Sequence, residues 1–95
     1  MNVAIVGAAG YTGGMLIRML LHHGRVGEEN MTAVSGSHAG HHVATAHPDL
    51  AGSTDLNFAP NLIDTPDVIF LCTGHGKAAS WMLEHNVPAE TLVID

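Results

Sequence analysis

The stretch VAIVGAAGYTGGMLIRML, residues 3–20, decides how this chain begins to fold. Val3 to Val6 form a continuous apolar run, which is typical of a strand buried on both faces of a parallel sheet. From Thr12 the apolar residues recur at the spacing of an amphipathic helix, which we expect to end at Gly24. The predicted apolar stripe of this helix comprises Met15, Leu16, Ile17, Met19, Leu20 and Leu21.

Between the predicted strand and helix, three glycines lie three residues apart at Gly7, Gly10 and Gly13. In a dinucleotide-binding turn, the first glycine turns the chain sharply, the second brings the backbone close to a pyrophosphate, and the third lets the helix pack closely. The anion then meets free N–H groups at the positive end of the helix dipole. We predict that these glycines, with Tyr11 and Thr12, contact the cofactor. The alternative is a glycine-rich turn that binds nothing.

The remaining segments alternate between strand and helix patterns. Strands are predicted at 31–35, 55–58, 68–72 and 92–94, and a helix at 77–85 with Trp81 and Met82 in the core; residues 36–52 receive no element. This order predicts an α/β fold, a Rossmann-type parallel sheet with helices on both faces. Because a buried final strand needs cover on both faces, we expect residues 1–95 to be one NAD(P)-binding domain that is cut off inside its own architecture.

Composition and charge argue against a nucleic-acid-binding, secreted or membrane protein. The 95 residues are 46% hydrophobic and carry a net charge of −6, all of it from residues 49–95. A deficit of Lys and Arg argues against nucleic-acid binding. The single cysteine, Cys72, indicates a reducing compartment. No segment reads as a signal peptide or a membrane span, so we expect a cytoplasmic protein without a membrane partner.

The end of the predicted second strand bears on the choice of cofactor. NAD-binding sites usually carry Asp or Glu there to bind the ribose 2′-hydroxyl, but the sequence from Val34 reads VSGSH. We therefore predict NADP (NADPH), with the hydroxyls of Ser35 and Ser37 donating to the 2′-phosphate and protonated His38 adding charge. Alternatively, these residues only form a turn.

A second glycine loop follows the strongest predicted strand, at Thr73-Gly74-His75-Gly76. In a doubly wound sheet, ligands bind beyond the carboxyl ends of the strands near the switch point. We therefore expect this loop to lie beside the first glycine turn, with Gly74, His75 and Gly76 contacting the cofactor. A plain strand-to-helix turn is the alternative.

Together these motifs make the chain resemble N-acetyl-gamma-glutamyl-phosphate reductase over essentially its whole length. The matching stretches are VGAAGYTG (6–13), SHAG (37–40), HPDLAG (47–52), and VIFL (68–71) leading into GHG (74–76). The resemblance implies an oxidoreductase of arginine biosynthesis that reduces N-acetyl-glutamyl phosphate with NADPH. It implies that residues 1–95 are an N-terminal fragment truncated before a catalytic domain. The nucleophilic cysteine and the acid/base histidine would lie in that domain, beyond residue 95, hence no catalytic residue in this chain, and the full-length protein would be a homo-oligomer.

Other interpretations stay open at this point. The chain departs from some members of the family by lacking an Arg after the second strand and by carrying His41 and His42 where many have Lys. It is alternatively a stand-alone nucleotide-binding regulatory module, or part of an enzyme like aspartate-semialdehyde dehydrogenase. Cys72 follows a buried strand and is expected to be an inert packing group. The histidines at 38, 41, 42 and 47 match no zinc spacing, so we predict no metal.

Overall fold

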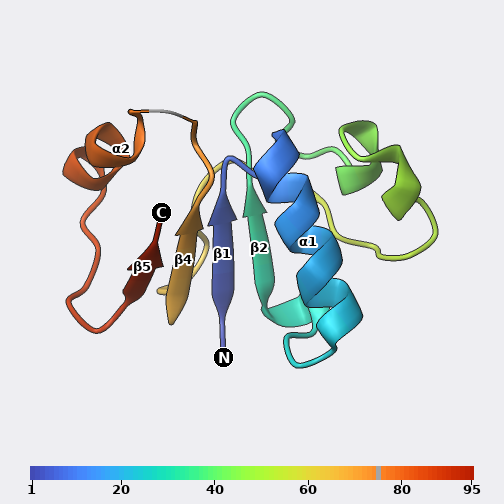
Figure 1. Cartoon of the computed structure of the whole chain (residues 1–95), viewed down its shortest axis with the longest axis horizontal. Helices are drawn as coiled ribbons and strands as arrows, with labels where there is room; N and C mark the ends of the chain where they lie inside the picture. The colour runs from blue at the N-terminus through green and yellow to red at the C-terminus, as the bar shows by residue number, and fades with distance from the viewer. Residues whose placement is uncertain (75) are drawn as a thin grey trace.

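A parallel sheet of five strands in the order β3-β2-β1-β4-β5 forms the frame of the molecule (Figure 1). The computed structural model describes residues 1–74 and 76–95. The strands are β1 (Val3–Val6), β2 (Met31–Val34), β3 (Phe58–Ala59), β4 (Val68–Leu71) and β5 (Leu92–Ile94). This order confirms the predicted Rossmann-type sheet, and its switch point lies where the chain returns past β1 to begin β4.

The register of the strands aligns their carboxyl ends. Val6 lies opposite Val34 on one side and opposite Leu71 on the other. The chain therefore leaves β1, β2 and β4 at the same edge of the sheet. The glycine turn and the segments after β2 and β4 all begin there, which is the edge where ligands of this fold bind.

Helix α1 (Tyr11–His23) follows the glycine turn and ends where the sequence predicted, at Gly24 with φ +79°. Its buried face consists of Gly13, Gly14 and Ile17. Met15 and Met19, which the predicted stripe included, are 54% and 63% exposed. The prediction was wrong for these two because the helix approaches the sheet so closely that glycines, rather than large side chains, mark the contact.

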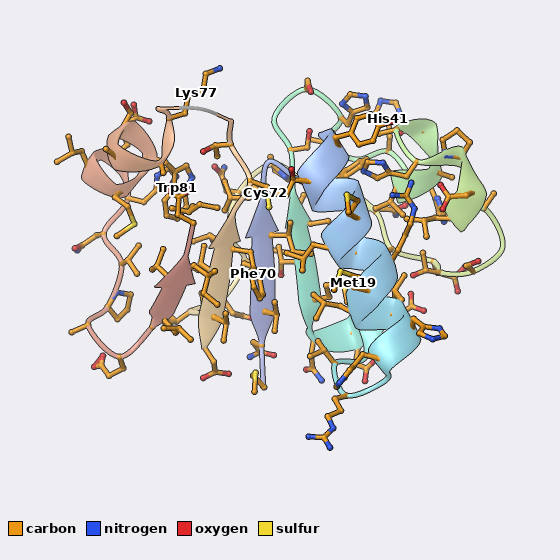
Figure 2. All side chains as sticks on the ribbon, in the orientation of Figure 1. Met19, His41, Phe70, Cys72, Lys77 and Trp81 are labelled. Atoms are coloured by element: carbon orange, nitrogen blue, oxygen red, sulfur yellow. The ribbon has the colours of Figure 1, made fainter. Side chains whose placement is uncertain are left out.

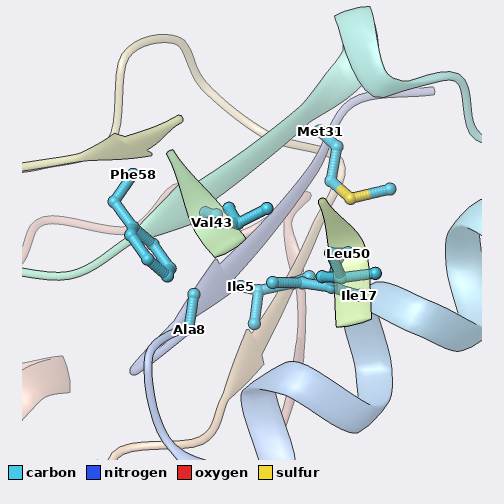
Figure 3. Close-up of a cluster of buried hydrophobic side chains, with 8 residues drawn as sticks. Ile5, Ala8, Ile17, Met31, Val43, Leu50 and Phe58 are labelled. Atoms are coloured by element: carbon cyan, nitrogen blue, oxygen red, sulfur yellow. The ribbon is translucent and has the colours of Figure 1, made fainter. Parts of the chain in front are cut away.

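The main hydrophobic core lies between the α1 face of the sheet and the segment after β2 (Figure 3). Ile5 of β1 and Ile17 of α1 are fully buried at its centre. The other members are Ala8, Met31, Ala33, Val43, Leu50 and Phe58. Residues 36–52, to which the sequence assigned no element, thus supply two buried anchors on short 3₁₀ turns, η2 (Val43–Thr45) and η3 (Pro48–Leu50).

The opposite face of the sheet is covered by α2 (Ala78–Glu84), from which Trp81 packs on a second cluster. The core role predicted for Trp81 is therefore confirmed in part, while Met82 is 39% exposed and that expectation was wrong. On the α1 side, no described helix covers β5, and Leu92 and Ile94 are 57% and 41% exposed. Figure 2 shows Phe70 and Met19 on this side.

The short third strand differs from its prediction. The alternation at 55–58 indicated a strand there, but β3 spans Phe58–Ala59 and pairs with Ala33 and Val34. Residues 54 and 55 are instead held by Glu28, whose carboxylate accepts from the Thr54 hydroxyl (3.1 Å) and the Asp55 N–H (3.0 Å). That long-range contact has no local sequence signal. Within the part of the chain described, no helix has the length and apolarity to cross a membrane.

Candidate functional site

Two of the three spaced glycines are required by the fold itself. Gly7 has φ +80°, and a Cβ built there would lie 2.3 Å from the carbonyl oxygen of Cys72. A Cβ on Gly13 would lie 2.6 Å from the Gly7 carbonyl oxygen and 2.7 Å from the Ala8 Cα. Backbone atoms cannot move aside at such distances. The sharp turn and the close helix packing expected from the sequence are therefore both seen.

Gly10 is different, because no described residue excludes a side chain there. Its φ of −80° is open to any residue. A Cβ would meet only the Gly7 carbonyl oxygen, at an ordinary 3.5 Å. Gly10 is also exposed and lies at the mouth of a cleft. Within residues 1–74 and 76–95, the fold thus gives no reason for a glycine at this position.

The first turn of α1 offers unpaired donors beside Gly10. An α-helix leaves its first N–H groups without intrahelical partners, here those of Tyr11, Thr12 and Gly13. No side chain caps this end of α1, and no acidic residue lies in its first turn. The positive end of the helix dipole is therefore open to an anion.

The cleft has a volume of about 790 Å³ and joins the two glycine loops, as the sequence predicted. Gly10, Tyr11 and Thr12 line one side, and Gly74 and Gly76 line the other. Tyr11 is 91% exposed. His75, which the sequence also predicted as a contact, lies outside the described residues.

A polar group without a partner lines the same cleft. The hydroxyl oxygen of Thr73 is buried and makes no hydrogen bond with any described residue. Buried polar groups in folded proteins are nearly always satisfied, so this hydroxyl requires a partner beyond the described residues. The sequence of the loop gives Thr73 no distinct role, because a buried hydroxyl without a partner is visible only in three dimensions.

The segment after β2 is folded by its own polar side chains and does not line the cleft. Ser35 is buried, and its Oγ accepts a hydrogen bond from the His38 N–H at 3.3 Å. Ser37 is exposed, with its Oγ 2.9 Å from Nδ1 of His38. Ser35 therefore shapes the turn, whereas Ser37 and His38 present polar groups at the edge of the sheet. No carboxylate is present in this turn.

Cys72 lies at the carboxyl end of β4, beside the cleft (Figure 2). Partial burial raises the pKa of its thiol, and the nearby negative charge of Asp95 raises it further. A thiol with a raised pKa carries less of the nucleophilic thiolate at neutral pH. The environment of Cys72 is that of a packing residue rather than an activated nucleophile.

Two of the four histidines between residues 38 and 47 make separate structural contacts. His42 caps η2 by accepting from the Ala44 N–H at Nδ1 (2.9 Å), so its Nε2–H donates to the Thr54 carbonyl oxygen (2.7 Å). His47 is buried and bonded to the glycine turn. Over residues 1–74 and 76–95, no three His, Cys, Asp or Glu side chains are grouped to hold a metal ion.

Comparison with known proteins agrees with this geometry. Residues 2–95 match the family model described as semialdehyde dehydrogenase, NAD binding domain. Over 99% of its length, the chain is 43% identical to an N-acetyl-gamma-glutamyl-phosphate reductase of Bacteroides thetaiotaomicron and 41% identical to one of Flavobacterium johnsoniae. It is also 43% identical, over 85% of its length, to a putative [LysW]-L-2-aminoadipate/[LysW]-L-glutamate phosphate reductase of Pyrobaculum calidifontis. The chain spans 23–29% of the length of these relatives.

Proposed function

The chain belongs to the semialdehyde dehydrogenase family as its NAD-binding domain, and we propose that it serves a reductase that converts N-acetyl-glutamyl phosphate to its semialdehyde with NADPH. Membership of the family makes the ligand a nicotinamide dinucleotide. The choice of NADP, the contact residues and the substrate are the proposal. The observation that carries it is Gly10, an exposed glycine that the fold does not require, at the mouth of the cleft.

The residues around the cleft fit such a cofactor. In the proposed complex, the pyrophosphate lies against Gly10 and accepts hydrogen bonds from the N–H groups of Tyr11, Thr12 and Gly13. The free hydroxyl of Thr73 supplies a further polar contact between the two loops. Gly7 supports the turn by adopting the positive φ that its sharp bend requires. Gly74, Gly76 and His75 are the proposed contacts on the far side of the cleft, and the bound dihydronicotinamide supplies the hydride.

We propose that the segment after β2 selects NADP over NAD. A carboxylate in this turn would repel a 2′-phosphate and bind a 2′-hydroxyl, and the turn carries none. The exposed Ser37 hydroxyl and the adjoining His38 ring are the proposed donors, with the buried Ser35 hydroxyl holding the turn in shape. Protonation of His38 would add a charge-assisted bond to the phosphate.

We place the catalytic groups outside these 95 residues, because the one cysteine present lacks the environment of a nucleophile. In the proposed reaction, a cysteine elsewhere in the reductase attacks the acyl phosphate and expels phosphate, which leaves a thioester. Addition of a hydride to the thioester carbonyl, followed by cleavage of the C–S bond, would release the semialdehyde and regenerate the cysteine. We also propose a homo-oligomeric enzyme of the cytoplasm, from the resemblance to the reductases and from the single free cysteine.

Cofactor choice is tested by titrating the chain with NADPH and NADH while following the emission of Trp81, the only tryptophan. We expect tighter binding of NADPH. The Ser37→Asp variant should lose that preference through repulsion of the 2′-phosphate, whereas the matched Ser53→Asp variant, with the same charge at another exposed site, should keep it. Equal affinities in the unmodified chain would exclude the NADP assignment.

The substrate is tested with a chimera in which these 95 residues replace the matching part of the Bacteroides thetaiotaomicron reductase. We expect the chimera to oxidise NADPH in the presence of N-acetyl-glutamyl phosphate and the chain alone to turn over nothing. A chimera that folds and binds NADPH but fails to reduce this substrate would contradict the proposed function.

A further inference from the structure

His47 lies far along the chain from the glycine turn but is bonded to it. The side chain is only 5% exposed, and its Nε2 lies 2.7 Å from the carbonyl oxygen of Ala8. Because a carbonyl oxygen only accepts, Nε2 carries the proton and donates it. We infer that His47 is a positioning residue: it fixes the orientation of the turn that holds the cofactor pyrophosphate. The inference rests on the proposed function for its link to the cofactor.

The bond fixes a particular peptide unit. The N–H of Ala8 donates to the Val34 carbonyl oxygen at 3.0 Å, so β2 holds the unit that precedes Ala8. His47 holds the carbonyl of the next unit, between Ala8 and Ala9. That peptide is trans, so its C=O and N–H point in opposite directions. Holding the carbonyl on His47 therefore holds the Ala9 N–H away from His47 and sets the direction in which the chain enters Gly10.

Gly14 provides the room for the imidazole. A Cβ at this position would lie 2.4 Å from Cε1, 2.5 Å from Nδ1 and 2.9 Å from Nε2 of His47. The ring thus occupies the space that any side chain on this face of α1 would fill. Gly14 falls outside the three-glycine spacing of the motif, and the structure explains it by His47 rather than by a phosphate.

The segment that carries His47 is held in place without its side chain. Val43 and Leu50 are buried in the main core on either side of it. The Asp49 carboxylate accepts two hydrogen bonds from Arg18 of α1, at 2.5 and 2.7 Å. Removing the imidazole therefore leaves 43–50 attached to the molecule. The consequence of its loss should fall on the glycine turn, which has no other side-chain bond to its Ala8 carbonyl among the described residues.

The test compares two replacements in the 95-residue chain. His47→Leu keeps an apolar side chain but loses the donor, whereas the amide of His47→Gln can still donate to the Ala8 carbonyl. Without the imidazole, the Ala8 carbonyl is expected to turn toward water in the free chain, and cofactor binding must return it to a buried position without a partner, at a cost that corresponds to about tenfold in the binding constant. We expect NADPH binding to weaken by about this factor in His47→Leu and to recover in His47→Gln. Gly14→Ala, which displaces the ring, should behave like His47→Leu.

Two controls separate positioning from general stability. Asp49→Asn removes the exposed ion pair of the same segment and should leave the NADPH affinity unchanged. Amide hydrogen exchange of Ala8 and Gly10, whose N–H groups are bonded to Val34 and Gly7, should accelerate in His47→Leu without any cofactor. A lowered melting temperature with unchanged NADPH affinity and unchanged exchange would overturn the inference. If the unmodified chain bound no NADPH, the proposed function would fail, and the exchange measurement would still decide the role of His47.

Discussion

Replacing Gly10 with alanine should separate folding from cofactor binding. The fold has room for the methyl group, since the built Cβ meets only the Gly7 carbonyl oxygen at 3.5 Å. At a helix N-cap, alanine is less favourable than glycine by up to about 1 kcal/mol. Alanine also lowers the conformational entropy of the unfolded chain, which stabilises the folded state by about 0.4–1 kcal/mol. The free energy of unfolding should therefore change by less than about 1 kcal/mol.

The same methyl group points to the place proposed for the pyrophosphate. Forcing an extra methyl group into a packed contact costs about 1–3 kcal/mol, which corresponds to about 5- to 150-fold in affinity. The assay is a titration with NADPH, alongside urea unfolding of the same sample, both followed through Trp81. We expect a large loss of affinity with an almost unchanged unfolding midpoint.

The matched control is Gly24→Ala, at the other end of α1. Gly24 has φ +79° with nothing within 4 Å of a built Cβ. Alanine at this position should therefore cost only the energy of the left-handed backbone conformation, about 1–2 kcal/mol. This variant should lose stability and keep its affinity for NADPH, the reverse of Gly10→Ala. An affinity for NADPH within about twofold of the original in a folded Gly10→Ala protein would refute the assignment of the pyrophosphate to this turn.

Three further outcomes follow from the structure. Gly13→Ala should lower the free energy of unfolding by about 1–3 kcal/mol in a urea titration, because its Cβ meets backbone atoms of Gly7 and Ala8; an unchanged midpoint would contradict the close packing of α1. Ile17→Ala, at a fully buried core position, should cost about 2–5 kcal/mol in the same assay. The alkylation rate of Cys72 should rise at a higher pH than that of a free thiol, because its pKa is raised, and the difference should vanish in urea; a native profile whose midpoint pH is equal to or lower than that of a free thiol would exclude this environment.

Local patterns determined most of the framework in advance. The apolar runs of β1, β4 and β5 and the helix end at Gly24 were correctly located, because continuous apolar runs and a terminal glycine are signals carried by neighbouring residues. The glycine spacing likewise predicted the strand–turn–helix unit. The loop after β4 was expected beside that turn, since the carboxyl ends of parallel strands share one edge of the sheet.

Tertiary contacts decided what those patterns could not. Met15 and Met19 fit the helical stripe but lie exposed, because the buried side of α1 is set by where Gly13 allows it to approach the turn. The position of β3 depended on partners in β2, and the 3₁₀ turns around Val43 and Leu50 depended on a core assembled from distant residues.

The division between sequence and structure is clearest at the candidate site. The spacing of the glycines predicted a sharp turn at Gly7, an approaching pyrophosphate at Gly10 and close helix packing at Gly13. The folded chain shows which atoms are responsible: backbone atoms crowd Gly7 and Gly13, while at Gly10 no described residue excludes a side chain. In the sequence, His47 was only part of a stretch that resembles the reductase family. The structure shows that its ring is bonded to the carbonyl oxygen of Ala8, 39 residues away in the chain. Local sequence fixes the conformation of a turn, whereas the contacts that hold it in place come from residues that meet only after the sheet has formed.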